Sequence, residues 1–323
     1  MSIKSSLIQS SIDPNKNFWQ VSILVPKSAS MTVEYFFIES GAVGSYEILY
    51  QEGITNNLQE DNTTLVFFFE ENFPLKAFIA MSLPVLKLEN SEYEIELINY
   101  AKFLSSLVDT FKTFLITENM QIVPPWDYEA SEYRKDVPFL ILNPSFAFGT
   151  GKHQTTKLMV EFIEKNVKGK ECVIDVGCGS GILGIAALKQ GASTVIGIDV
   201  ENLSVENAND NYTRNSMENN IEGRAKFLQG GFEQAVTQIK GEGNGDTNSG
   251  NCKNPDIFLS NILPATFKQN KKHLEVLLKS SNVWALSGVN SESRNDFFAW
   301  LKTITKDEIH ETELDDWHLF SNV

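Results

Sequence analysis

The stretch VIDVGCGSGILG, residues Val173–Gly184, decides the predicted fold of this chain. A β-branched run reaches Asp175, glycines then occupy every second position from Gly177 to Gly181, and helix-forming residues begin at Ile182. Because glycine lacks a side chain, its backbone can approach a ligand closely, and the N-terminus of the following helix points at that ligand. The stretch therefore predicts a strand, a loop and a helix that together bind a small molecule.

Two further strand ends carry polar side chains that would face the same ligand. The run TVIGIDV ends near Asp199, and the run PDIFLSN ends at Asn261. Because ligands gather at the carboxyl ends of parallel strands, both side chains are expected in one crevice with the glycine loop. There the Asp199 carboxylate can accept hydrogen bonds from both hydroxyls of a ribose. The side-chain carbonyl of Asn261, with the backbone carbonyl of Ile262 or Leu263 beside it, can accept a hydrogen bond from a substrate amine. The alternative is a helix N-cap, which is the more common role of an isolated Asn at such a position.

Two classes of ligand fit a glycine loop of this kind. The glycines from Gly179 to Gly184 satisfy the G-x-G-x-x-G pattern of dinucleotide-binding proteins, with Asp199 as the distal acid. Asp175, however, would repel a pyrophosphate at the end of the strand, and Gly177 lengthens the loop to D-x-G-x-G-x-G. S-adenosylmethionine has no phosphate, and its amino group and sulfonium tolerate nearby carboxylates. The loop favours S-adenosylmethionine, with a nicotinamide-dependent oxidoreductase as the alternative.

The second half of the chain predicts an α/β domain. From Val137 onward, strand-like and helical segments alternate, which is typical of a doubly wound, mostly parallel sheet of Rossmann-like architecture. A polar Gly- and Asn-rich run, Lys240–Asn254, interrupts them and predicts a disordered surface loop. The expected strands are Val173–Val176, Thr194–Val200, Ala225–Gln229, Asp256–Ser260 and Asn282–Ser287.

A smaller α+β domain is predicted for residues 1–98. Its segments read as strand, helix, strand, strand, helix and strand, which is the ferredoxin-like order. The run Phe67–Phe69 breaks the alternation of the third strand, so both faces of that strand are expected to be covered. Residues 99–123 are expected to form a connector helix, reaching about Thr117, and a linker, and residues 124–323 the larger domain.

Composition limits the class of partner and the compartment. The 323 residues carry a formal net charge of −15 at a sequence pI of about 4.8, which favours a basic protein or peptide partner over nucleic acid. No apolar run approaches the roughly 20 residues of a membrane helix, so a cytoplasmic protein is expected. The three cysteines, an odd number, predict a reducing compartment and no disulfide framework. Neither the cysteines nor the four histidines have metal-ligand spacing, so no metal is expected.

Five blocks of sequence, in order, resemble one known family. They are FAFGTGKHQTT, VIDVGCGSGILGIAALKQGA, VIGIDV, SNIL and LSG, between Phe146 and Gly288. Over roughly Pro124–Val323 the chain resembles the methyltransferases that modify large-subunit ribosomal protein eleven. The resemblance implies a class I S-adenosylmethionine-dependent methyltransferase domain, a ferredoxin-like domain that recognises the substrate, and methylation of amines (lysine side chains or the amino terminus) of that basic ribosomal protein. The same chemistry on another protein substrate remains an alternative.

The resemblance also implies which residues contact S-adenosylmethionine. The positions that match the family's contacts are Thr156, Gly177, Asp199 and Asn261. The reading of the glycine loop adds Gly179, which with Gly177 would line the methionine end of the cofactor. Asn261 is expected to position the substrate amine as well.

The block FAFGTGKHQTT is predicted to be the lip of this pocket. Gly149 and Gly151 permit a tight loop, and Thr155 or Thr156 can cap the helix that follows. His153 is expected to brace the loop through a backbone hydrogen bond, with a role as catalytic base as the alternative. The sequence gives no indication of the oligomeric state.

Overall fold

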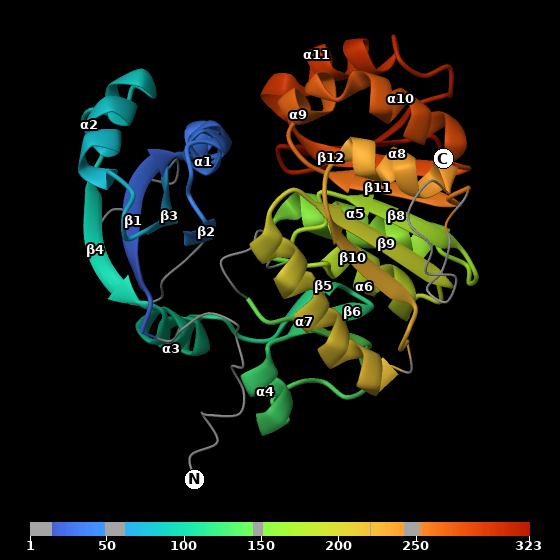
Figure 1. Ribbon diagram of the computed structural model, residues 1–323, viewed down its shortest axis with the longest axis horizontal. Helices are drawn as coiled ribbons and strands as arrows, with labels where there is room; N and C mark the ends of the chain where they lie inside the picture. The colour runs from blue at the N-terminus through green and yellow to red at the C-terminus, as the bar shows by residue number, and fades with distance from the viewer. Residues whose placement is uncertain (1–14, 49–61, 145–150, 220, 242–251, 253) are drawn as a thin grey trace. The chain divides into compact units, whose positions relative to one another are not determined.

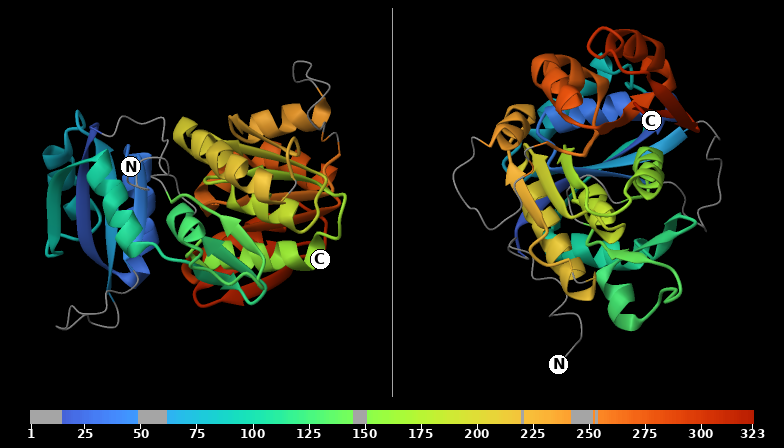
Figure 2. Two further views of the ribbon diagram at one scale, coloured as in Figure 1. Left: turned by 90° about the horizontal axis from the view of Figure 1, so that it is seen from below. Right: turned by 90° about the vertical axis from the view of Figure 1, so that its right-hand side faces the viewer.

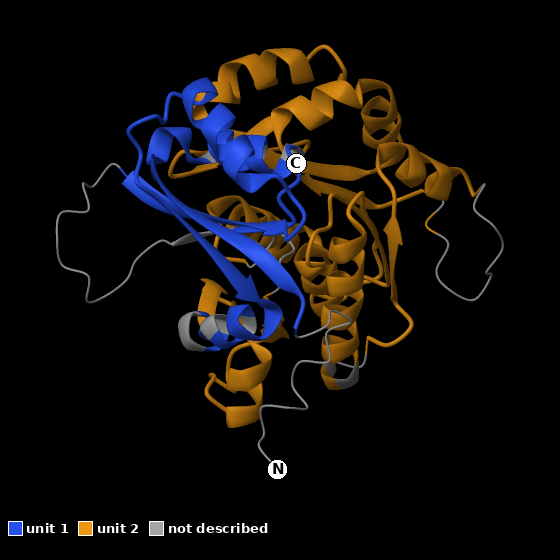
Figure 3. Cartoon of the chain, turned by 60° about the vertical axis from the view of Figure 1, so that its left-hand side comes forward, with its two compact units in different colours: residues 1–112, 145–148 blue, residues 113–144, 149–323 orange. Residues whose placement is uncertain are grey.

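The computed structural model describes residues 15–48, 62–144, 151–219, 221–241, 252 and 254–323 (Figure 1). The first five residues of the predicted pocket lip, 146–150, and most of the predicted polar insertion, 242–251, lie outside the described residues. The chain divides into two compact units, residues 1–112 with 145–148, and residues 113–144 with 149–323 (Figure 3).

Unit 1 has the element order that the sequence predicts. Its sheet has the strand order β2-β3-β1-β4, and every neighbouring pair is antiparallel. This is the ferredoxin-like arrangement. Its elements are β1 (Asn17–Pro26), η2 (Lys27–Ala29), α1 (Ser30–Glu39), β2 (Gly44–Ile48), β3 (Asn62–Glu70), α2 (Leu75–Val85), β4 (Tyr93–Asn99) and α3 (Tyr100–Thr110).

The three consecutive phenylalanines of β3 are buried on both faces of the sheet, as predicted. Phe67 and Phe69 pack in a core with residues of α1 and α2, and the rings of Phe67 and Phe37 are 4.3 Å apart. Phe68 points to the opposite face, where its ring meets that of Phe103 in α3 at 4.8 Å. A continuous apolar run in a strand is therefore explained by two covered faces.

The connector helix is shorter than the sequence predicts. Helix α3 ends at Thr110, and Phe114–Thr117 forms strand β5, which pairs with β6. Asp127, which is buried, accepts hydrogen bonds at Oδ2 from the backbone N–H and the hydroxyl of Thr113, at 2.7 and 2.9 Å. Strand pairing and this buried carboxylate outweigh the helical periodicity, and the second unit begins at Thr113.

Unit 2 is built on a seven-stranded sheet with the order β10-β9-β8-β11-β12-β14-β13. The first five strands of that order are parallel, whereas β14 runs antiparallel to both β12 and β13. A separate sheet of β5, β6 and β7 accompanies it. The strands are β5 (Phe114–Thr117), β6 (Met120–Val123), β7 (Phe139–Ile141), β8 (Cys172–Val176), β9 (Thr194–Asp199), β10 (Ala225–Gln229), β11 (Ile257–Asn261), β12 (Val283–Asn290), β13 (His310–Leu314) and β14 (Trp317–Ser321).

Helices cover both faces of the large sheet. Helices α8–α11 pack on one face, where they share an apolar core with residues of β8, β9, β11, β12 and β14. Helices α5–α7 contact the strands from the other side (Figures 1 and 2). The doubly wound, Rossmann-like prediction is confirmed. The helices are α4 (Pro125–Ala130), α5 (Gln154–Asn166), α6 (Ile182–Lys189), α7 (Asn202–Asn219), α8 (Phe232–Lys240), α9 (Pro264–Gln269), α10 (Lys271–Ser280) and α11 (Ser291–Leu301).

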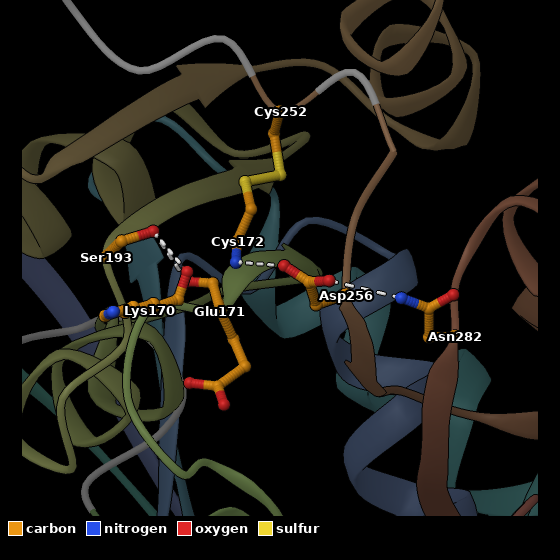
Figure 4. The surroundings of a disulfide bond; sticks show 7 residues. All are labelled: Lys170, Glu171, Cys172, Ser193, Cys252, Asp256 and Asn282. Carbon is orange, nitrogen blue, oxygen red and sulfur yellow. Dashed lines mark hydrogen bonds between the residues drawn. A yellow bond between two sulfur atoms is a disulfide. The ribbon is translucent and has the colours of Figure 1, made fainter.

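The prediction that the chain has no disulfide is wrong. Cys172 and Cys252 are bonded, with their Cα atoms 5.8 Å apart (Figure 4). They are 80 residues apart in the sequence, but β8 and β11 are neighbouring strands, so Cys172 at the start of β8 meets Cys252 in the segment before β11. Asp256 strengthens this junction, because its Oδ2 accepts the backbone N–H of Cys172 at 2.9 Å. Cys178 is the free cysteine, and it is buried.

None of the described helices combines the length and the apolar character that crossing a bilayer requires.

Reduction of the disulfide is expected to destabilise the protein. A cross-link between residues 80 positions apart restricts the unfolded chain, so reductant should lower the free energy of unfolding by about 2–4 kcal/mol. Urea unfolding with and without dithiothreitol measures this difference. The double variant Cys172→Ser with Cys252→Ser is the control, because its stability should not respond to reductant. A count of three thiols, instead of one, in the denatured, unreduced protein would contradict the bond.

Candidate functional site

The glycine loop after β8 is held against the end of β9. The backbone N–H groups of Gly177 and Cys178 both donate to the carbonyl of Ile198, at 2.8 and 3.1 Å. The N–H of Gly179 donates to Oδ2 of Asp199 at 2.8 Å. Gly177 and Gly179 have φ angles of +78° and +51°, which L side chains rarely adopt, so the loop needs glycine at both positions.

Asp199 lies at the end of β9, as predicted, and both of its oxygens are engaged. Oδ1 accepts the backbone N–H of Glu201 at 3.0 Å, and Oδ2 accepts that of Gly179. A carboxylate has about four acceptor positions, so roughly two remain for ribose hydroxyls. Burial raises the pKa of Asp199 above its ordinary value, while these backbone donors oppose the rise.

The end of β11 approaches the glycine loop closely. A Cβ at Gly177 would lie 2.4 Å from Cγ2 of Ile262, and a Cβ at Gly288 would lie 2.2 Å from the carbonyl oxygen of Ile262. Ser260 adds a buried hydrogen bond from its hydroxyl to the carbonyl of Val176, at 2.7 Å. Asn261, the last residue of β11, is thereby fixed beside the loop.

The backbone carbonyls of Ile262 and Leu263, which were predicted to accept a hydrogen bond from the substrate amine, already face other backbone groups. The carbonyl of Leu263 accepts the N–H of Thr266 at 3.1 Å, because it begins helix α9. The carbonyl oxygen of Ile262 faces the backbone of Gly288. Asn261 donates from Nδ2, and its Oδ1 accepts no hydrogen bond from the described residues. The side chain of Asn261 is therefore the best acceptor of the three for a substrate amine.

Helix α5 begins beside Asn261 and is capped by His153. Nδ1 of His153 accepts the backbone N–H of Thr155 at 3.2 Å, and its carbonyl accepts that of Thr156 at 3.0 Å. The sequence predicted a threonine cap, whereas the imidazole performs this role. His153 therefore makes a hydrogen bond to the backbone, as predicted, but this bond caps α5, and residues 146–150 of the loop that it was expected to brace lie outside the described residues. Burial lowers the pKa of His153 to about 4.

The structure brings the five predicted site residues to one edge of the sheet. A hydrogen bond joins Gly179 to Asp199, and Ile262 links Gly177 to Asn261. The amide of Asn261 donates to Oγ1 of Thr155, the residue before Thr156, at 3.1 Å. All five stand at the carboxyl ends of β8, β9 and β11 or in the first turn of α5. Open α/β sheets bind ligands at this edge.

Asp175, the acid at the end of β8, is fully buried. Neither of its oxygens makes a hydrogen bond of ordinary geometry with the described residues. Burial, with a further contribution from the charge of Asp199, raises the pKa of Asp175 to about 7. Two acids that interact at this edge of the sheet, with no lysine or arginine in the glycine loop, suit a cationic ligand better than a diphosphate.

A row of asparagines on α7 holds the glycine loop and the end of β7, and it was not predicted from the sequence. Asn211 is buried, donates from Nδ2 to the carbonyl of Ser180 at 2.9 Å, and accepts the N–H of Asn143 at 2.8 Å. Asn215 bonds both the N–H and the carbonyl of Ile141. The signal was present in the four-residue spacing of Asn207, Asn211 and Asn215, which puts all three amides on one helix face.

No group of three or more histidine, cysteine or acidic side chains within the described ranges is arranged to hold a metal ion.

Residues 17–322 match the family of ribosomal protein L11 methyltransferases (PrmA). The chain belongs to this family. A ribosomal protein L11 methyltransferase of Halalkalibacterium halodurans is 34% identical over 64% of this chain and 59% of its own length. One of Leptospira interrogans is 26% identical over 93% of this chain and 96% of its own. The family agrees with the S-adenosylmethionine interpretation of the glycine loop and not with a nicotinamide-dependent oxidoreductase.

A solved structure of a ribosomal protein L11 methylase from Lactobacillus delbrueckii subsp. bulgaricus is also similar. It is 25% identical to this chain, covers 65% of it and 97% of its own chain, and has a TM-score of 0.49.

The contact between Gly288 and Ile262 predicts an unusually costly glycine substitution. Gly288→Ala puts a Cβ 2.2 Å from a backbone oxygen at a φ of +88°, so the loss of stability should reach about 3 kcal/mol or more. Gly223→Ala is the matched control, because it has a φ of +73° and no atom within 4 Å of the added Cβ, and should lose about 1–2 kcal/mol. Equal losses in urea unfolding would show that β12 does not confine Ile262.

The buried carboxyl of Asp175 predicts a pH-dependent stability difference. Its pKa of about 7 in the folded protein exceeds the ordinary value near 4, so the ionised unfolded chain is favoured increasingly as the pH rises from about 4 to 7. Asp175→Asn abolishes this titration. The free energy of unfolding of Asp175→Asn minus that of the parent, both without cofactor, should therefore rise by up to about 4 kcal/mol between pH 4 and pH 7. Above that range the difference should stay constant.

Urea unfolding at a series of pH values measures this difference. Asp136→Asn serves as the control, because Asp136 is exposed, is paired with Arg134 and has a lowered pKa. The stability of this variant relative to the parent should not increase as the pH rises. A stability difference for Asp175→Asn that does not change with pH would mean that Asp175 titrates normally.

Proposed function

We propose that the protein is an S-adenosylmethionine-dependent protein N-methyltransferase that methylates amines, lysine side chains or the amino terminus, of ribosomal protein L11. The observation that carries the proposal is the convergence of the glycine loop, Asp199 and Asn261 at one sheet edge in a chain of this family. The relatives named above supply the substrate by their names.

The residues of the crevice fit the proposed cofactor. Asp199 retains acceptor positions for the ribose hydroxyls, and the backbone of Gly177 and Gly179 would line the methionine end. Thr156 and Asn261 would complete the contacts. The loop from Val173 to Gly184 contains no lysine or arginine, so no basic side chain of the loop would oppose a cationic ligand. When bound, S-adenosylmethionine supplies a methyl group on a positively charged sulfonium.

The chain's task is then to orient a neutral amine in line with that methyl group. Orientation can contribute on the order of 7–11 kcal/mol to such a reaction. Oδ1 of Asn261 would accept an N–H of the amine and aim the nitrogen lone pair. His153 is not needed as a base, because the amine can lose its proton to water and Nδ1 of His153 already accepts the N–H of Thr155.

A basic ribosomal protein also suits the charge of the chain. The formal net charge of −15 favours association with a basic partner through long-range attraction. Unit 1, with its ferredoxin-like sheet, is proposed to recognise this partner, and modification of a ribosomal protein would take place in the cytoplasm. Another basic protein is the second candidate substrate, and comparing the proteome of a deletion strain by mass spectrometry separates the two.

Transfer of radiolabel tests the function directly. Purified protein incubated with methyl-labelled S-adenosylmethionine should label L11, and mass spectrometry should place the methyl groups on lysine side chains or the amino terminus. Absence of label on L11 would refute the proposed substrate. Label on other ribosomal proteins alone would favour the second candidate.

Asp199→Ala is predicted to weaken cofactor binding. Loss of hydrogen bonds to a charged group should cost about 1.5–3 kcal/mol of binding free energy, measured by titration calorimetry with S-adenosylmethionine. Asp136→Ala removes an exposed carboxylate of the same unit and should leave the affinity unchanged. An unchanged affinity in Asp199→Ala would exclude Asp199 from the binding site.

A further inference from the structure

A chain of hydrogen bonds runs from Asn261 into the start of α5. Nδ2 of Asn261 lies 3.1 Å from Oγ1 of Thr155, and that oxygen lies 2.7 Å from Nδ1 of His153. The backbone N–H of Thr155 also points at Nδ1, at 3.2 Å. The family match and the predicted cofactor contacts leave Thr155 without a role, although only 2% of its surface is exposed.

The backbone N–H of Thr155, which can only donate, sets the direction of the other hydrogen bonds in this chain. Nδ1 of His153 accepts the backbone N–H of Thr155, so Nδ1 carries a lone pair and no proton. The Thr155 hydroxyl must then donate to Nδ1, which leaves its oxygen as an acceptor. Only the NH₂ group of Asn261 can donate to that oxygen, so Oδ1 of Asn261 must point the other way.

The surroundings keep the imidazole in this state. His153 is half-buried, and its ring meets the ring of Trp317 edge-on, with centroids 4.4 Å apart. Trp317 lies in β14, a strand of the large sheet, so the chain of hydrogen bonds is supported from the sheet as well as from α5. The lowered pKa keeps the ring neutral at physiological pH.

This orientation matters for the proposed methyl transfer. An Asn261 amide turned by 180° would present NH₂ to the substrate amine. The NH₂ group would then donate to the nitrogen lone pair that has to attack the methyl group, and no oxygen would accept an N–H of the amine. We propose that Thr155, held by His153, is a positioning residue that fixes the Asn261 carboxamide with Oδ1 toward the substrate amine. The proposal rests on the proposed function, and its first test does not depend on the substrate.

Nitrogen NMR of the protein alone tests the orientation. The parent protein should show His153 protonated at Nε2 and unprotonated at Nδ1, and Thr155→Val should shift the Asn261 side-chain amide signals. Thr155→Ser keeps the hydroxyl and should preserve the parental signals. A parental His153 protonated at Nδ1, or Asn261 amide signals unchanged in Thr155→Val, would overturn the proposal whether or not L11 is the substrate.

Turnover with L11 tests the consequence for the reaction. Thr155→Val should lower kcat at least about ten-fold, because misplacing a reactive group is costly, while the Kd for S-adenosylmethionine changes less than about three-fold. Thr155→Ser should restore kcat to within about three-fold of the parent. Thr156→Val is the matched comparison, because the neighbouring threonine is assigned to the cofactor and its variant should raise the Kd instead.

A double-variant cycle separates positioning from a merely structural role. If Thr155 acts through Asn261, Thr155→Val should have little further effect on kcat in an Asn261→Ala background. Additive losses, or a Thr155→Ser variant as impaired as Thr155→Val, would contradict the proposal. A parent enzyme that transfers no methyl group to L11 would instead refute the proposed function, and the NMR experiment would still decide the orientation of Asn261.

Discussion

The close approach of two loops, one after β8 and one after β11, governs the rest of the site. Any side chain at Gly177 would collide with Ile262, and any side chain at Gly288 would collide with the backbone of Ile262. Ile262 is thus confined from two strands of the sheet. Because Asn261 is the residue before Ile262, its position at the carboxyl edge of the sheet is fixed as well. Glycine at these positions is a steric requirement of the crevice and not only a matter of turn formation.

Burial sets the electrostatics of the same crevice. Asp175 is fully buried and accepts no ordinary hydrogen bond from the described residues, so its pKa rises, whereas Asp199 receives two backbone N–H groups. A cationic ligand near these acids would stabilise their charged forms. Burial also disfavours the charged form of His153, which lowers the pKa of the imidazole, so the ring remains a neutral acceptor at the start of α5. The same low-dielectric environment therefore favours a cationic ligand near Asp175 and Asp199 and a neutral chain of hydrogen bonds at His153.

Much of the fold could be predicted from local sequence. The strand before Asp175, the glycines after it and the helix from Ile182 are specified by residues close together in the chain, and they form as predicted. The order of elements in unit 1 follows likewise from short-range patterns.

Features that depend on distant partners were missed. Phe114–Thr117 reads as helix but pairs with β6, and Cys172 meets Cys252 only because β8 and β11 are neighbours in the sheet. The strands β13 and β14 likewise depend on tertiary contacts, because they pair with each other and β14 pairs with β12.

A crystal structure with S-adenosylhomocysteine tests the central claim most directly. The account predicts that its ribose hydroxyls lie within hydrogen-bond distance of Asp199. Its amino acid end should lie along the backbone of Gly177 and Gly179, with Thr156 and Asn261 in contact. A ligand bound elsewhere, or a crevice left empty at saturating ligand, would contradict the account.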